Sequence, residues 1–247
     1  MLEVFNFKMK SIYLQILEAL QFLSSPEKKD FLPYFFKTGK GEYGEGDLFL
    51  GVKVPDQRSV AKEYYSKINL NELSELLSSP YHEHRLTALL MLISKFEKTK
   101  DQAIKDEVVE FYLNHLPYIN NWDLVDTSCY KILGRYAFEN QKENLLKELS
   151  KSNEMWHKRI AVVGTMYYVK KGSFELTKEF VTQNLHHPHD LMHKANGWLL
   201  REMGNKNEAV LIDYLNKYYK EMPRTCLRYA IEKLDEEVRQ DYLKGRI

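Results

Sequence analysis

The most constraining feature of this sequence is its helical periodicity, which continues from residue 55 almost to the C-terminus. Apolar residues recur at the three- and four-residue spacing of amphipathic helices. No segment shows the strict alternation of a half-buried strand bounded by hairpin turns. Proline or glycine separates many of the helical segments, at Pro80, Pro117, Gly172, Pro188, Gly204 and Pro223. The sequence therefore predicts an all-α protein with helices over 10–24, 56–67, 70–79, 82–98, 102–116, 121–138, 141–150, 155–171, 174–184, 189–203, 205–219, 223–234 and 236–244.

Weak internal repeats indicate how these helices are arranged. Arg85, Trp122 and Arg159 are each 37 residues apart, and Trp198 follows 39 residues later. A period near 40 residues in paired helices is typical of HEAT-type α-solenoids. We therefore expect a single domain over residues 1–247, an α-α superhelix of HEAT-like repeats with a concave face. The segment that departs from this pattern is 37–55, which reads as an irregular Gly-rich loop.

Composition narrows the class of protein without naming a partner. The chain is 44% hydrophobic and 29% charged, which is typical of a folded protein. Its net charge of +1 does not by itself indicate nucleic-acid binding. Residues 1–155 hold 20 Lys and Arg against 23 Asp and Glu, whereas residues 156–247 hold 16 against 12. This asymmetry permits a basic surface in the second part of the chain.

Cysteine use and hydropathy bear on the compartment. Cys129 and Cys226 lie far apart and match no disulfide framework or metal-binding spacing. No apolar run approaches the length of a membrane-spanning helix, and residues 1–11 lack the apolar core of a signal peptide. We expect a soluble, cytoplasmic protein.

Two local patterns resemble ligand sites only superficially. Residues Gly39–Gly44 satisfy GxGxxG, but no strand precedes them and acidic residues follow, which is unlike a dinucleotide site. His186, His187, His189 and His193 cluster around a proline, and the last two lie four residues apart. A metal site would need a third ligand at a recognisable spacing. We expect neither a cofactor nor a metal.

The segment NNWDLVD at 120–126 carries more information. Either asparagine is a plausible N-cap, so a helix is expected to begin here with Trp122 and Asp126 on one face. In isolation, a tryptophan at this position is more often core, and an aspartate in the first turn often complements the helix dipole. A functional reading is favoured because Arg159 and Trp198 fall at a similar phase in the following repeats.

Five segments, taken in order, resemble the AlkD-type alkylpurine DNA glycosylases. They are FFKTGKGEYGEGDLFLGV at 35–52, NWDLVD at 121–126, RIA at 159–161, HKANGWLLRE at 193–202 and MPRTCLRYA at 222–230. This resemblance covers nearly the whole chain. It implies HEAT-like repeats around a concave DNA-binding groove, and an enzyme that excises N3- and N7-alkylated purines, such as 3-methyladenine and 7-methylguanine, from double-stranded DNA. A monomer is the default for an enzyme that clasps a duplex. Some members carry a tyrosine where Phe35 aligns here, although Tyr43 could take its place.

The resemblance also implies roles for individual residues. Asp126 would stabilise the electron-poor sugar of the transition state, and Trp122 and Trp198 would offer π faces to the cationic lesion and the sugar. Arg159 would hold an adjacent phosphate. Further phosphate contacts are expected from Arg58, Lys158, Lys194, Arg201, Arg224 and Arg228. Two alternatives remain open, a non-catalytic helical-repeat protein that binds DNA or protein, and a glycosylase-like protein that binds damaged DNA without excising bases.

Overall fold

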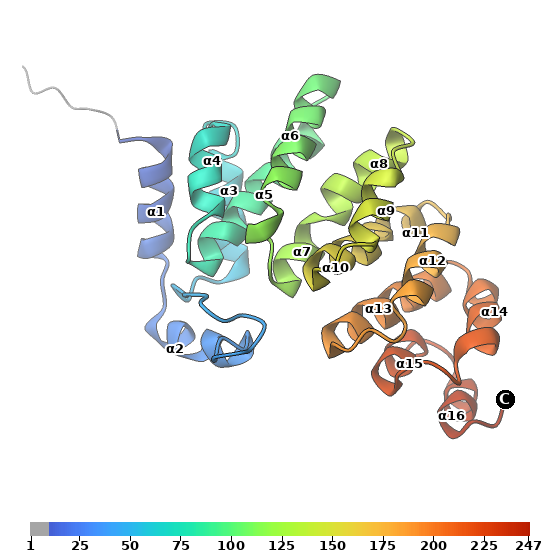
Figure 1. Cartoon of the computed structure of the whole chain (residues 1–247). Helices are drawn as coiled ribbons and strands as arrows, with labels where there is room; N and C mark the ends of the chain where they lie inside the picture. The colour runs from blue at the N-terminus through green and yellow to red at the C-terminus, as the bar shows by residue number, and fades with distance from the viewer. Residues whose placement is uncertain (1–9) are drawn as a thin grey trace, which may run out of the picture. The chain divides into compact units, whose positions relative to one another are not determined.

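The computed structural model describes residues 10–247 of the chain (Figure 1). Across these residues the secondary structure is helical, and no β-strand forms; the backbones of Leu48 and Tyr81 meet in an isolated bridge. The prediction of an all-α protein is confirmed. None of the helices in this part of the chain is both long and apolar enough to cross a membrane.

The chain falls into two compact units, one ending at Leu124 and the other beginning at Val125. The division lies inside helix α7 (Trp122–Ser128). Each unit has buried apolar residues of its own. The single domain expected over 1–247 stays a prediction.

In the first unit, helix α5 forms the centre of the core. Thirteen of its residues are buried, and between Leu86 and Ile93 its sequence is apolar except at Thr87. Helices α3, α4 and α6 all pack against α5, and α1 packs against α3 and α4. The helices of this unit are α1 (Ile12–Phe22), α2 (Pro26–Phe35), α3 (Val54–Tyr64), α4 (Leu70–Leu77), α5 (His82–Lys98) and α6 (Gln102–Asn114), followed by a 3-10 turn (Leu116–Tyr118).

Helix α2 was missed by the sequence analysis. Its ten residues include Pro33, and a proline inside a segment normally argues against a helix. The helix begins with Pro26, a position where proline is tolerated because no intrahelical N–H bond is lost. None of its residues is buried, so it also lacks the apolar stripe on which periodicity depends.

The segment between α2 and α3 is irregular, as predicted, and it is held by a buried carboxylate. The Glu83 carboxylate, only 1% exposed, accepts backbone N–H bonds from Leu50 (3.0 Å), Gly51 (2.8 Å) and Val52 (3.2 Å). Gly51 has a φ of 85°, a left-handed conformation that favours glycine. The residues of the GxGxxG pattern form turns with no strand before them, so they do not build a dinucleotide site.

In the second unit, α13 packs against α10, α14 and α15, and α10 packs against α9 (Figure 1). The elements that follow α7 are a π-helical turn (Tyr130–Gly134), α8 (Arg135–Glu139), α9 (Asn144–Ser150), α10 (Met155–Gly164), α11 (Met166–Lys170), α12 (Glu175–Gln183), α13 (Asp190–Lys206), α14 (Glu208–Tyr218), α15 (Arg224–Ala230) and α16 (Glu236–Lys244).

Three predicted boundaries in this unit differ from the structure. The single helix expected over 121–138 contains the π-helical turn, and the one expected over 155–171 is divided at Thr165. The expected break at Gly204 is absent, because α13 continues to Lys206 and Asn207 caps α14. A Cβ at position 204 would overlap the Leu211 side chain, so this glycine allows two helices to approach closely.

Candidate functional site

In the second unit, the structure brings together two of the predicted site residues, Asp126 and Arg159. Arg159 on α10 donates from Nε to Asp126 Oδ1 (2.9 Å) and from Nη2 to Oδ2 (2.7 Å), a bidentate ion pair. Nη1 donates to the carbonyl oxygen of Leu191. The Arg159 side chain is 5% exposed, whereas Asp126 retains 19% exposure. The carboxylate is therefore held in one orientation while part of it still meets solvent.

A buried thiol lies one turn beyond this carboxylate. Cys129 is fully buried, and burial raises the pKa of its thiol, as does the negative charge of Asp126. The neutral thiol is thus favoured, and a cysteine nucleophile is not provided here.

In the first unit, Trp122 lies in a cluster of aromatic rings. Its ring stacks on Phe36 at 5.6 Å with an interplanar angle of 25°, and meets Phe35 edge-on at 6.0 Å and 65°. The Asn121 side chain accepts the Trp122 N–H at 2.8 Å, so α7 begins where the sequence predicted. The ring of Phe35, the residue aligned with the family's tyrosine, contacts Trp122, and Phe35 remains 50% exposed.

Beneath this aromatic cluster lies a buried network of two acids and two bases. His82 Nδ1 is 3.1 Å from Asp47 Oδ2, and His82 Nε2 is 2.7 Å from Asp123 Oδ2. Arg85 Nη2 is 2.6 Å from the same Asp47 oxygen, and Arg85 Nη1 donates to Asn120 Oδ1 at 2.8 Å. The network therefore connects the irregular loop, α5 and the start of α7.

His82 must carry a proton for the charges of this network to balance. Burial lowers the pKa of His82, but attraction to Asp123 and hydrogen bonds to Asp123 and Asp47 outweigh it and raise the pKa to about 9. The His82 ring contacts Phe36 (4.6 Å) and Phe49 (5.2 Å), measured between ring centroids, and these two phenylalanine rings also stack on each other at 5.3 Å. The imidazolium thus contacts two aromatic rings and bridges two carboxylates, one of which belongs to Asp123, the residue next to Trp122.

An apolar hollow of about 550 Å³ opens over this aromatic cluster in the first unit. Most of the surface that lines this hollow is apolar, and Trp122 and two lysines are among the lining residues. Its lining includes Lys28, Phe35, Phe36, Phe49, Lys53 and Trp122.

Trp198 lies on α13 in the second unit, where its indole Nε1 donates to Glu202 Oε1 at 3.2 Å. Glu202 in turn lies 3.5 Å from Arg201 Nη2. The indole is half-buried, so part of its ring stays accessible.

The comparisons with known proteins agree with this helical architecture. The sequence pattern of one family, described as DNA alkylation repair enzyme, matches residues 16–234. The chain belongs to this family. A solved structure described as a predicted DNA alkylation repair enzyme from Enterococcus faecalis shares the fold, with a TM-score of 0.69 and 18% identity. That match covers 88% of this chain and 99% of the other. None of the curated proteins matches the sequence.

In this DNA alkylation repair enzyme, the six basic residues predicted to contact phosphates divide into two groups. Lys194 pairs with Asp190 at 2.9 Å, and Arg201 pairs with Glu232 and Glu202. The others have no acidic partner within ion-pair distance among residues 10–247, although Arg224 donates to the Leu243 carbonyl at 3.1 Å. They are Arg58, Lys158, Arg224 and Arg228.

The histidine cluster is built as a turn. His193 Nε2 lies 2.6 Å from the His187 carbonyl oxygen, and the ring of His189 caps α13. Among the residues that the structure describes, no group of three or more His, Cys, Asp or Glu side chains is arranged to hold a metal ion.

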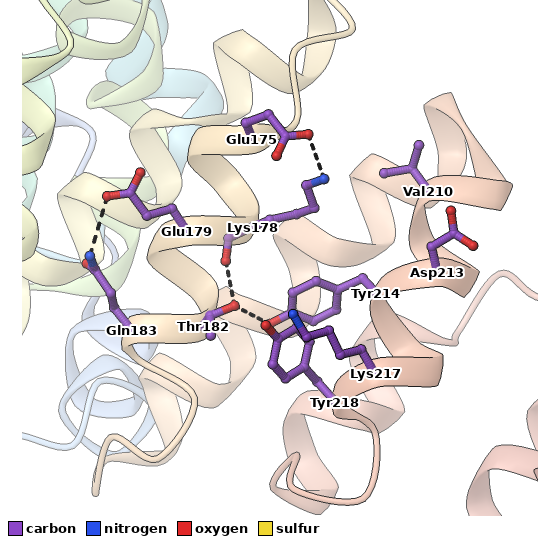
Figure 2. Close-up of a pocket in the computed structure, with 10 residues that line it drawn as sticks. All are labelled: Glu175, Lys178, Glu179, Thr182, Gln183, Val210, Asp213, Tyr214, Lys217 and Tyr218. Atoms are coloured by element: carbon purple, nitrogen blue, oxygen red, sulfur yellow. Dashed lines mark hydrogen bonds and ion pairs between the residues drawn. The ribbon is translucent and has the colours of Figure 1, made fainter.

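A second hollow, of about 700 Å³, lies between α12 and α14 and contains none of the predicted site residues (Figure 2). Thr182 and Tyr214 share a hydrogen bond of 3.1 Å at its base. Burial raises the pKa of the Tyr214 hydroxyl to about 12, so it stays protonated at neutral pH. Acidic and basic side chains alternate around this hollow, and no arginine in its lining orients a carboxylate as Arg159 orients Asp126.

Sequence reasoning missed Asp47, His82 and Glu83, whose buried polar contacts hold the irregular loop and the start of α7. Asp47 lay in a segment read only as a loop, and His82 and Glu83 lay in a helix read only as a repeat. Their partners are 31 to 41 positions away in the chain. A hydrophobic pattern carries no signal for polar contacts at such separations. One sign was available in principle, because consecutive polar residues open an otherwise apolar helix at 82–85.

Proposed function

We propose that this family member is a monofunctional DNA glycosylase that hydrolyses the N-glycosidic bond of cationic N3- and N7-alkylated purines in double-stranded DNA. The observation that carries the proposal is the Asp126 carboxylate, oriented by both arms of the Arg159 guanidinium and still partly exposed. The family described as DNA alkylation repair enzyme supplies the substrate context.

The chemistry needs little beyond such a carboxylate. An N3- or N7-alkylated purine already carries a positive charge, so it leaves without being protonated by the enzyme. The transition state then resembles the oxocarbenium ion of glycoside hydrolysis. A negative charge placed next to the sugar stabilises it, and the carboxylate oxygens can also orient the attacking water.

The remaining residues take supporting roles. Trp122 precedes Asp126 by four residues on α7, and Trp198 exposes part of its ring on α13. Each indole face would attract the cationic lesion or the developing sugar cation, worth on the order of 1 kcal/mol when desolvated. Arg159 would act chiefly by holding Asp126, while the unpaired basic residues contact phosphates. The enzyme would act as a monomer and without a cofactor.

The test is the release of 7-methylguanine from a methylated duplex by the wild type and by Asp126→Asn. The amide leaves one oxygen to accept from Arg159 and removes the negative charge. We expect a rate loss of about 100-fold or more, with DNA binding retained. Asp213→Asn, on α14, is the matched control and should keep full activity.

An inactive but folded wild type, tested on several N3- and N7-alkylated purines, would contradict the proposal. A helical-repeat protein that binds DNA without excision would then be the better description. Equal activity of the wild type and Asp126→Asn would instead contradict the catalytic role of the carboxylate, while the proposal of a DNA glycosylase would remain.

A further inference from the structure

The turn between α12 and α13 fixes the proton positions of two histidine rings. His187 Nδ1 accepts the backbone N–H of His189 at 3.1 Å, and His189 Nδ1 accepts that of Leu191 at 3.2 Å. A neutral imidazole has one donor and one acceptor nitrogen. Because Nδ1 is the acceptor in each ring, Nε2 carries the hydrogen. His187 therefore presents an N–H donor from Nε2, and this nitrogen has no hydrogen-bond partner among residues 10–247.

The surroundings also keep His187 neutral. Burial lowers the pKa of His187, and the positive charge of Lys158 lowers it further. Protonation would in addition break the bond from the His189 N–H, because Nδ1 would become a donor. The ring is thus a directed donor without a charge of its own.

Next to this donor is a cation without a counter-charge. Lys158 directly precedes Arg159, whose guanidinium donates to the Leu191 carbonyl at the start of α13, so this part of α10 lies against the turn, and the charge of Lys158 lowers the His187 pKa. No carboxylate within the described chain lies within ion-pair distance of the Lys158 ammonium group. The neighbouring Arg159 guanidinium is occupied by Asp126 and by the Leu191 carbonyl. An anion placed here would meet one positive charge and one neutral N–H.

We propose that Lys158 and His187 form a two-point binding site for a backbone phosphate of duplex DNA, with the charge from Lys158 and a neutral Nε2–H donor from His187. This inference rests on the proposed function, because that function makes DNA the source of the anion. It also gives the histidine cluster a task other than metal binding, since the lone pair of His187 Nδ1 is used by the His189 N–H.

The two contacts differ in how salt affects them. Each phosphate neutralised by Lys or Arg releases counterions and steepens the fall of affinity with salt, by about 0.9 in the log–log slope. A neutral donor releases none. His187 therefore strengthens binding equally at low and high salt, whereas the contribution of Lys158 diminishes as salt rises.

The experiment measures the Kd of the full-length protein for an undamaged duplex by fluorescence anisotropy, between about 50 and 200 mM KCl. His187→Asn keeps an oxygen in place of Nδ1, so the His189 N–H retains its acceptor while the Nε2 donor is lost. We expect binding about 2- to 10-fold weaker at every salt concentration, with an unchanged slope. Lys158→Gln should reduce the slope by about 0.9.

Two further variants complete the set. His187→Gln places an amide N–H near the former Nε2 and should recover part of the affinity. His186→Asn is the matched control, because His186 is 69% exposed and lies 3.7 Å from Glu221. It should bind like the wild type.

The inference is overturned if His187→Asn binds as tightly as the wild type, or if it lowers the salt slope as Lys158→Gln does. Nitrogen NMR of the wild type gives an independent check that needs no variant. A His187 ring that is charged, or protonated on Nδ1, at neutral pH would overturn it too. If the phosphate site is overturned while the wild type still releases 7-methylguanine, only the phosphate site is wrong and the proposed function stands. If the wild type binds no duplex DNA, the proposed function is overturned as well.

Discussion

Both carboxylate oxygens of Asp126 accept hydrogen bonds from one guanidinium, that of Arg159, at 2.9 and 2.7 Å. The arginine is almost fully buried and the aspartate is not. The buried guanidinium therefore holds the carboxylate in place while the carboxylate stays partly accessible to solvent. A planar fork that binds two oxygens fixes both the position and the rotation of the carboxylate. We therefore expect the shape of the guanidinium, and not only its charge, to matter for catalysis.

Arg159→Lys should lower kcat for 7-methylguanine release by about 100-fold, because an ammonium group cannot hold both oxygens and small displacements are costly. The Kd for undamaged DNA should change much less. Single-turnover rates and anisotropy titrations separate the two effects. A loss of DNA binding with an unchanged single-turnover rate would show that Arg159 contacts phosphate instead.

The π-helical turn after Asp126 brings Gly134 against the backbone of Gly164 on α10. A Cβ at position 134 would overlap the Gly164 carbonyl oxygen, whereas one at position 164 would meet only the flexible Leu146 side chain, at 3.0 Å. Gly134→Ala should therefore reduce the free energy of unfolding by roughly 1–3 kcal/mol or more, and Gly164→Ala by less. Urea denaturation of both variants tests this order, and the reverse order would contradict the close backbone contact.

Glu83→Gln should loosen the irregular loop locally. The amide would turn N–H groups towards backbone N–H groups that now donate to a carboxylate, leaving buried donors unsatisfied at a cost of about 1–3 kcal/mol. Hydrogen exchange at residues 50–52 should become faster. Glu42→Gln is the control in the same loop, since Glu42 accepts the Gly39 N–H at 2.8 Å at an exposed position. Equal protection in the two variants would argue against the special role of Glu83.

The buried network should make stability depend on pH at both ends of the range. The His82 pKa is raised from 6.5 to about 9, so its contribution is complete below pH 6.5 and is lost as pH rises through about 9. Burial raises the pKa of Asp47, but His82 and Arg85 lower it below 3.8 overall. Its contribution is therefore present above pH 3.8 and is lost as pH falls through the lowered value.

A comparison with His82→Gln isolates the alkaline part of this effect. The variant leaves a buried carboxylate uncompensated, so near neutral pH it should be less stable by on the order of 3 kcal/mol. The gap should narrow as the wild-type imidazolium loses its proton. Urea unfolding of both proteins across the alkaline range measures the gap, and a constant difference would show that His82 does not titrate in this range.

Periodicity predicted much of the fold, and the exceptions are instructive. It located α5, α13 and most of the other helices, since each has an apolar face that recurs in sequence. It failed at α2, which buries no residue. It also failed at Gly204, where a break between helices was expected but the glycine lies inside α13 and packs closely against Leu211. The π-helical turn was also not predicted; it ends at Gly134, which packs against Gly164, a glycine 30 residues later in the chain.

The same distinction holds for the candidate site. The sequence by itself determined that Trp122 and Asp126 lie four residues apart on one helix, and the order of its motifs indicated the family. Only the tertiary structure decided that Arg159 holds Asp126, that a protonated His82 supports the start of α7, and that His187 presents a neutral donor next to Lys158. The physical reason is range. Helical patterns arise from interactions between residues three or four positions apart, whereas hydrogen bonds and buried charges depend on side chains that only the packing of distant helices brings together.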